Sequence, residues 1–143
     1  MENSVIEILL IDDDPDDAEL TIHALKKNNL VNNLLYLDEG EKALEFLYSG
    51  ANEMPRLILL DLRMPKVDGV QILRKLKSDP DKQNIPVIVM LSSKEGKSYL
   101  ESFKVKADAY MVKPVDFKKF FTAISDIGLT WKILDSPVYR ENI

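Results

Sequence analysis

The chain has 143 residues, a formal net charge of −5 and a sequence pI near 4.9. This length fits a single domain that folds without disulfides, and the acidic balance argues against a nucleic-acid-binding module, which carries a basic face. There is no cysteine, which excludes thiolate metal sites and fits a reducing compartment, so we expect a cytoplasmic protein. Residues 1–4 do not resemble a signal peptide, and no apolar run is long enough for a membrane span.

Short apolar runs alternate with longer amphipathic stretches along the chain. Continuous apolar runs are typical of strands buried on both faces, and apolar residues three or four apart are typical of helices that cover a sheet. This alternation predicts an α/β fold with a parallel sheet and helices on both faces. The predicted strands are residues 5–11, 33–37, 57–60, 87–91 and 109–112.

The predicted helices lie between and after these strands. The first begins near Pro15, with Asp13 or Asp14 as its N-cap. The last helix carries an apolar stripe that we interpret as core packing, and Gly128 follows it as a helix end. The apolar positions of the five predicted helices, in chain order, are Ala18, Ile22 and Leu25; Ala43, Leu44 and Leu47; Val70, Leu73 and Leu76; Leu100 and Phe103; and the stripe Phe117, Phe120, Phe121, Ile124 and Ile127.

Polar groups follow four of the predicted strands. The carboxyl ends of parallel strands share one edge of the sheet, and open α/β sheets bind ligands at that edge. Each group alone has a structural explanation as a helix cap, a turn residue or a solvated charge. Together they place carboxylates, a hydroxyl and an ammonium in one small volume. The groups are Asp12-Asp13-Asp14 after the first strand, Asp61 after the third, Ser92-Ser93 after the fourth and Lys113 after the fifth.

These groups suit a particular chemistry. Clustered carboxylates repel one another unless a cation or a lysine offsets their charge. Oxygen ligands without histidine or cysteine favour Mg²⁺, Mn²⁺ or Ca²⁺, and a partly hydrated site with few carboxylates suits Mg²⁺. A divalent cation, an ammonium, a hydroxyl and a nucleophilic carboxylate are what phosphoryl transfer to an aspartate requires.

The ordered set resembles the receiver domain of bacterial two-component response regulators, as found in chemotaxis-type signalling. The resemblance covers about residues 5–127 and implies a doubly wound, flavodoxin-like, five-stranded parallel sheet in the order 2-1-3-4-5. The residues that carry it are Asp12-Asp13 after residues 8–11, Asp61 with Met64-Pro65 and Gly69, Ser92 after residues 87–91, and Lys113-Pro114 after Tyr110-Met111-Val112.

The resemblance also implies site roles. Asp61 is the expected phosphoacceptor, phosphorylated by a partner sensor histidine kinase or phosphotransfer protein. Asp13, Asp61 and the backbone carbonyl of Arg63 are expected to bind Mg²⁺, with Asp12 supporting the metal partly through water. The chain would catalyse only its own phosphorylation and dephosphorylation, and is otherwise not an enzyme.

The remaining residues would form the switch. Lys113 is expected to contact the phosphoryl group, Ser92 to move toward it, and Tyr110 to change rotamer with Ser92. The surface of the fourth helix, fifth strand and fifth helix would then bind a downstream protein or a second copy. Serine at position 92 stands where threonine is commoner, and it keeps the hydroxyl that the switch needs.

The expected organisation is a stand-alone receiver at residues 1–131 and a tail at residues 132–143. The apolar side chains that could dock on the domain from this end of the chain are Trp131, Ile133, Leu134, Val138 and Tyr139. The run of residues 12–17 and the tail are similar to the phytochrome-associated single-domain subgroup.

Two alternative functions stay open from the residues alone. Asp12 and Asp14 have the spacing of a Mg²⁺-dependent haloacid-dehalogenase-like phosphatase, in which Asp12 would be the nucleophile. The chain could also be a pseudo-receiver that binds partners without being phosphorylated. A calcium loop of the EF-hand type is excluded because Asp17 stands where that loop needs glycine.

Overall fold

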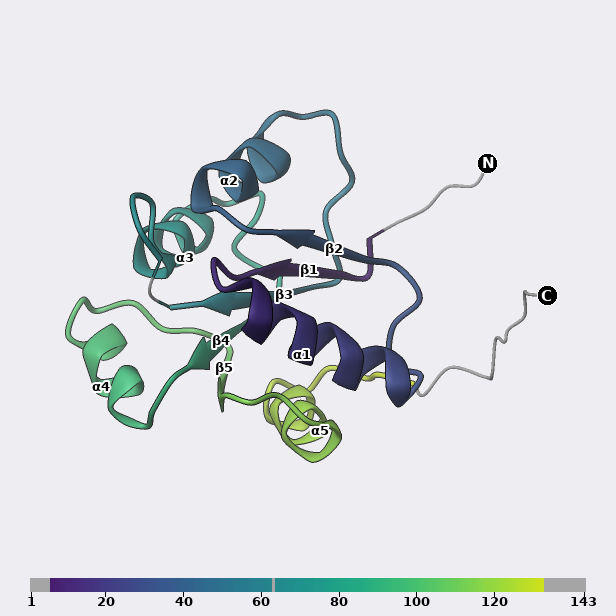
Figure 1. The fold of residues 1–143 in the computed structure, drawn as a ribbon. Coiled ribbons are helices and arrows are strands. Elements are labelled where there is room, and N and C mark those ends of the chain that lie inside the picture. The colour runs from purple at the N-terminus through teal and green to yellow at the C-terminus, as the bar shows by residue number, and fades with distance from the viewer. Residues whose placement is uncertain (1–5, 63, 133–143) are drawn as a thin grey trace.

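A computed structural model of the chain describes residues 6–62 and 64–132 (Figure 1). These residues form one parallel sheet with the strand order β2-β1-β3-β4-β5, as predicted. The strands are β1 (Ile8–Ile11), β2 (Leu34–Leu37), β3 (Leu57–Asp61), β4 (Val87–Leu91) and β5 (Ala109–Val112). The helices are α1 (Pro15–Lys27), α2 (Gly40–Tyr48), α3 (Gly69–Lys77), α4 (Glu95–Glu101) and α5 (Phe117–Asp126).

Helices cover both faces of the sheet, so the core has two halves (Figure 1). Alternate strand residues point to opposite faces. Leu9 and Ile11 therefore pack on the side of α2, α3 and α4, whereas Ile8 and Leu10 pack on the side of α1 and α5. All four side chains are fully buried, and burial of each such side chain contributes roughly 1.5–3 kcal/mol. This explains why β1 reads as a continuous apolar run.

The start of α1 settles the choice of N-cap. The side chain of Asp14 accepts hydrogen bonds from the backbone N–H groups of Asp16 and Asp17, at 2.9 and 3.2 Å. Asp14 is therefore the cap, and the Asp13 carboxylate does not have that role. The cap also fixes the first turn of α1 at the carboxyl edge of the sheet.

Two aromatic side chains differ from the predicted core. Phe117 is 38% exposed because it is the first residue of α5, and Phe103 is 40% exposed because α4 ends before it. The prediction that the whole Phe117–Phe121 stripe is core packing is therefore wrong for Phe117. The other end of α5 agrees with the sequence, since Gly128 follows the helix with a φ of 72°, which suits glycine.

Trp131 closes the described part of the chain by packing against the amino edge of the sheet. Its indole Nε1 donates a hydrogen bond of 2.7 Å to the carbonyl of Leu30, and its ring meets Phe120 edge-to-face at 5.6 Å. The Arg56 guanidinium lies 4.6 Å from the ring centroid. Docking of Ile133, Leu134, Val138 and Tyr139 concerns side chains outside the described residues.

Replacing Trp131 by alanine is expected to lower the free energy of unfolding by about 3 kcal/mol, because the change empties a buried site and leaves the Leu30 carbonyl without its donor. Urea unfolding followed by far-UV circular dichroism measures this change. Lys132→Ala is the matched control, since Lys132 is exposed. Equal stabilities of the two variants would contradict the prediction.

Within residues 6–62 and 64–132, no helix has both the length and the apolar character that crossing a membrane requires.

Candidate functional site

The carboxyl ends of β1, β3, β4 and β5 surround a cavity of about 400 Å³. The sequence placed its candidate groups at these strand ends, and most of them line this cavity. It is lined by Asp13, Asp14, Asp17, Asp61, Leu62, Ser92, Ser93, Glu95, Gly96 and Lys113.

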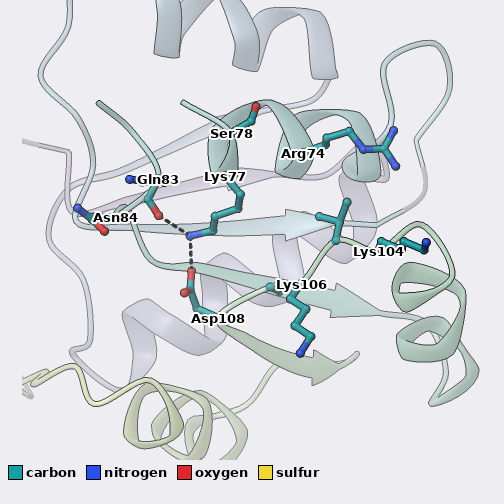
Figure 2. Close-up of a pocket in the computed structure, with 10 residues that line it drawn as sticks. Arg74, Lys77, Ser78, Gln83, Asn84, Lys104, Lys106 and Asp108 are labelled. Atoms are coloured by element: carbon teal, nitrogen blue, oxygen red, sulfur yellow. Dashed lines mark hydrogen bonds and ion pairs between the residues drawn. The ribbon is translucent and has the colours of Figure 1, made fainter. Parts of the chain in front are cut away.

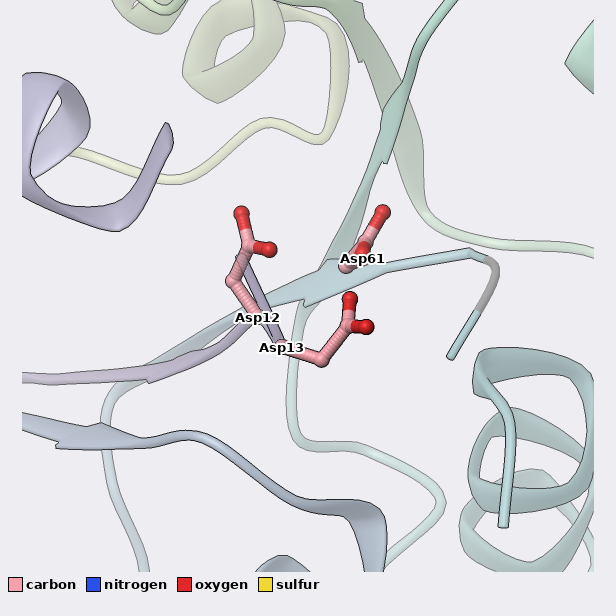
Figure 3. Close-up of side chains that lie close together, drawn as sticks. All are labelled: Asp12, Asp13 and Asp61. Atoms are coloured by element: carbon pink, nitrogen blue, oxygen red, sulfur yellow. The ribbon is translucent and has the colours of Figure 1, made fainter. Parts of the chain in front are cut away.

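Three carboxylates meet at the ends of β1 and β3. Asp12, Asp13 and Asp61 each offer an oxygen atom, and these atoms lie within 4.8 Å of one another (Figure 3). The two strands are neighbours in the sheet, and Ile11 lies opposite Leu60. Asp12 and Asp61, the next residue on each strand, therefore reach the same level at the edge of the sheet. Parallel pairing thus brings together residues that are far apart in sequence.

The buried carboxylate of Asp12 fits a bound cation. Asp12 is fully buried, and its Oδ1 accepts a hydrogen bond of 2.9 Å from the backbone N–H of Asp14. Its Oδ2 has no hydrogen-bond partner, although the Lys113 Nζ lies 3.0 Å away, so that contact is ionic and badly angled for a hydrogen bond. Buried charge of this kind needs compensation. Hard oxygen donors, one of which is buried and accepts no hydrogen bond, suit a hard divalent cation such as Mg²⁺.

The Lys113 side chain lies among the carboxylates. Its Nζ is 3.0 Å from Asp12 Oδ2, 3.0 Å from Asp17 Oδ2 and 3.4 Å from Asp61 Oδ1. Burial opposes its charge, but the contacts with Asp12, Asp61 and Asp17 outweigh burial and raise the pKa of the Lys113 ammonium. Lys113 therefore stays charged at this edge of the sheet.

Burial raises the pKa of Asp61 from 3.8 to about 7. Lys113 acts against this shift, while the negative charges of Asp12 and Asp13 add to it. The positive charge of Lys113 is therefore too small to balance the carboxylates around Asp61. A bound divalent cation would supply the missing positive charge.

Replacing Asp61 by asparagine is expected to raise the free energy of unfolding of the metal-free protein by roughly 1–2 kcal/mol at pH 8. The raised pKa means that ionised Asp61 destabilises the folded state; the penalty is absent well below pH 3.8 and complete above about pH 7. The uncorrected shift would correspond to about 4 kcal/mol, and solvent screening reduces it.

Urea unfolding in EDTA measures this stability difference. Added Mg²⁺ should stabilise the natural protein more than Asp61→Asn, because binding stabilises only the state that holds the ion. A less stable variant in EDTA would contradict the prediction.

The structure places the other predicted residues at different distances from this cavity. Ser92 is exposed and lines it together with Asp61. Tyr110 is half-buried on β5 outside the lining; its hydroxyl accepts a long hydrogen bond of 3.4 Å from the Ala107 N–H, and the Lys97 Nζ lies 5.2 Å from its ring centroid. Arg63 lies outside the described residues, so its carbonyl is not placed.

Gly69 shapes the loop that follows Asp61. Its N–H donates to the Leu62 carbonyl at 2.9 Å, and a Cβ at this position would collide with the carbonyl oxygens of Asp61 and Leu62. Only glycine allows α3 to begin this close to the end of β3. The glycine of the sequence motif thus has a packing reason.

Asp17 is the contact that sequence reasoning missed. It belongs to the first turn of α1, and Lys113 Nζ donates a hydrogen bond of 3.0 Å to its Oδ2 across 96 residues of chain. Its position in the sequence could have identified it, because the start of α1 directly follows the Asp12–Asp14 run and lies at the same edge of the sheet.

A larger cavity of about 590 Å³ lies at the opposite edge of the sheet (Figure 2). Its lining is mainly basic and amide-bearing, and its carboxylate, Asp108, is already paired with Lys77 at 2.7 Å. The Lys77 Nζ also donates to the carbonyls of Gln83 and Ile85. This cavity lacks the carboxylate cluster, so the candidate functional site is the smaller of the two cavities.

Comparisons with known proteins agree with this geometry. A family model described as the response regulator receiver domain matches residues 8–125. The response regulator Rcp1 of Synechocystis sp. is 32% identical over 128 residues, which is 87% of each chain.

Solved structures share the fold. The bacteriophytochrome response regulator AtBRR has a TM-score of 0.85 and 36% identity, and the match covers 94% of this chain and 100% of that one. The Mn²⁺-bound form of Rcp1 has a TM-score of 0.67 and 31% identity, covering 86% of this chain and 90% of that one. The predicted flavodoxin-like fold is therefore confirmed.

Proposed function

The chain belongs to the response regulator receiver family, and we propose that it is a single-domain response regulator whose Asp61 accepts a phosphoryl group. Members of this family are signalling domains rather than classical enzymes. The observation that carries the proposal is the position of Asp61 beside Asp12, Asp13 and the Lys113 ammonium at one cavity. The receiver would be residues 1–131, followed by a tail at residues 132–143.

Receiver domains bind Mg²⁺ or Mn²⁺ at their acidic pocket, and one neighbour is a Mn²⁺-bound form. In this chain Asp12, Asp13 and Asp61 would hold Mg²⁺, together with the Arg63 carbonyl. Bound Mg²⁺ would neutralise charge on the phosphoryl oxygens during transfer.

The residues of the chain would perform the transfer itself. An oxygen of the Asp61 carboxylate attacks the phosphorus of a phosphohistidine on the partner kinase. The new P–O bond forms as the P–N bond breaks, and the imidazole leaves with that electron pair. Lys113, 3.4 Å from Asp61 in the structure, would stabilise the negative charge on the transferred group.

The switch would follow from the new oxygens. Ser92 would turn inward to donate a hydrogen bond to them, and Tyr110 would fill the space that Ser92 leaves. The long Ala107–Tyr110 hydrogen bond and the partial exposure of Tyr110 support such a rotation at low cost. The result is a population shift on the surface of α4, β5 and α5, where a downstream protein or a second copy would bind.

The input would be a sensor histidine kinase or phosphotransfer protein, with a cytoplasmic location. Similarity to a bacteriophytochrome response regulator supports a kinase of the phytochrome type. No nucleic acid is expected as a partner, in line with the net charge of −5.

Acetyl phosphate with Mg²⁺, followed by peptide mapping of the adduct, tests the proposal. An adduct on Asp61 supports it. An adduct on Asp12 would favour the phosphatase, although Asp12 is fully buried and already accepts a hydrogen bond. Absence of any adduct would favour the pseudo-receiver.

A further inference from the structure

The Lys113 ammonium is shared between the metal cluster and a carboxylate outside it. Of the three carboxylates within reach, Asp17 is the one that accepts a hydrogen bond, at 3.0 Å. The contact with Asp12 at 3.0 Å and that with Asp61 at 3.4 Å are ion pairs. One hydrogen bond of this lysine thus goes to a carboxylate other than the proposed phosphoacceptor.

We propose that Asp17 is a positioning residue that competes with the phosphoryl group for Lys113, and so limits how tightly the site holds that group. The inference rests on the proposed function of Asp61. An ammonium has three N–H donors and no acceptor, so a donor committed to Asp17 is not available to a phosphoryl oxygen. A charge-assisted hydrogen bond of this kind is a strong competitor.

The position of Asp17 makes this competition persistent. The Asp14 cap fixes the first turn of α1, and the Asp17 N–H bonds to the Asp14 side chain at 3.2 Å. The side chain of Lys113 is only 12% exposed, whereas that of Asp17 is 39% exposed, so water screens their contact in part. The backbone of Asp17 is therefore fixed beside a largely buried ammonium.

Charge works in the same direction as hydrogen bonding. Asp17 lines the cavity, yet it is not a member of the Asp12–Asp13–Asp61 cluster that would hold the metal. A phosphoryl group brings close to two negative charges. Asp17 offsets part of the Lys113 charge and repels such a group, without contributing a metal ligand. Removing its charge should therefore favour the phosphorylated form.

The test compares Asp17→Asn with Asp14→Asn. Both changes remove one carboxylate from the same cavity, and asparagine keeps the capping function at position 14. The probe is beryllofluoride, which mimics a phosphoryl group on a carboxylate. Titration in saturating Mg²⁺, followed by amide NMR, should give a dissociation constant roughly fivefold lower for Asp17→Asn and changed less than about twofold for Asp14→Asn.

Mg²⁺ titration without beryllofluoride supplies a second readout, and its dissociation constant should change less than about twofold in either variant. An unchanged beryllofluoride affinity of Asp17→Asn would mean that Asp17 has a merely structural role. Equal gains in affinity in both variants would mean that only the net charge of the cavity matters, and weaker binding by Asp17→Asn would mean that Asp17 supports Lys113. Each of these three results overturns the inference while leaving Asp61 as the acceptor. A natural protein that binds no beryllofluoride overturns the phosphoacceptor proposal as well.

Discussion

Asp61→Asn is expected to reduce phosphate incorporation from acetyl phosphate in Mg²⁺ by roughly two orders of magnitude or more. The amide has nearly the same shape as the carboxylate, but it is not a nucleophile and cannot form an acyl phosphate. Intact-protein mass spectrometry measures the fraction carrying one phosphoryl group. Circular dichroism should show an unchanged fold, because Asp61 follows four fully buried residues of β3 that hold the strand in place.

Asp14→Asn is the matched control for this experiment. Asp14 lines the same cavity but lies outside the carboxylate cluster, so labelling should persist. Normal labelling of Asp61→Asn would remove Asp61 from the reaction. A label that moves to Asp12 would point to the phosphatase alternative.

Asp13→Ala is expected to weaken Mg²⁺ binding by about 10- to 100-fold, measured by calorimetry without any phosphodonor. Asp13 contributes one of the three carboxylate oxygens that lie within 4.8 Å of one another. Losing it leaves Asp12 and Asp61, and the ion would have to replace a charged ligand with water.

Asp16→Ala is the control for the metal experiment. Asp16 is an acidic residue of the first turn of α1, like Asp17, but it does not line the cavity. Its loss should change Mg²⁺ affinity less than twofold, as expected for a screened surface charge. Unchanged affinity in Asp13→Ala would take Asp13 out of the metal site.

The sheet could be predicted because its strands carry a strong local signal. The runs at residues 57–60 and 87–91 are apolar throughout, and both became fully buried strands. The edge strand β2 is only partly buried, and its pattern was correspondingly weaker. Asp61 alone could have been a turn residue, and it became a candidate only because polar groups follow three other strands at the same edge of the sheet.

Other features depend on contacts between distant parts of the chain, which leave no periodic pattern. The Lys113–Asp17 hydrogen bond joins residues 96 apart, and the Trp131–Leu30 bond joins residues 101 apart. Neither pair shares an element or a repeat. Phe117 is a case in which a periodic pattern was present but misleading. Helical spacing assigns it to the apolar stripe, whereas its place in the first turn of α5 leaves its side chain partly in solvent.

The position of Trp131 decides what optical spectroscopy can report on this protein. Trp131 is the single tryptophan of the sequence, and its indole packs at Leu30 and Arg56, at the amino edge of the sheet. The carboxylates and Lys113 lie at the other edge. Indole emission is therefore a reporter of unfolding in the core half around α1 and α5, and a local effect of Mg²⁺ on that emission is not expected. Any emission change on phosphorylation would instead record a rearrangement transmitted across the whole sheet.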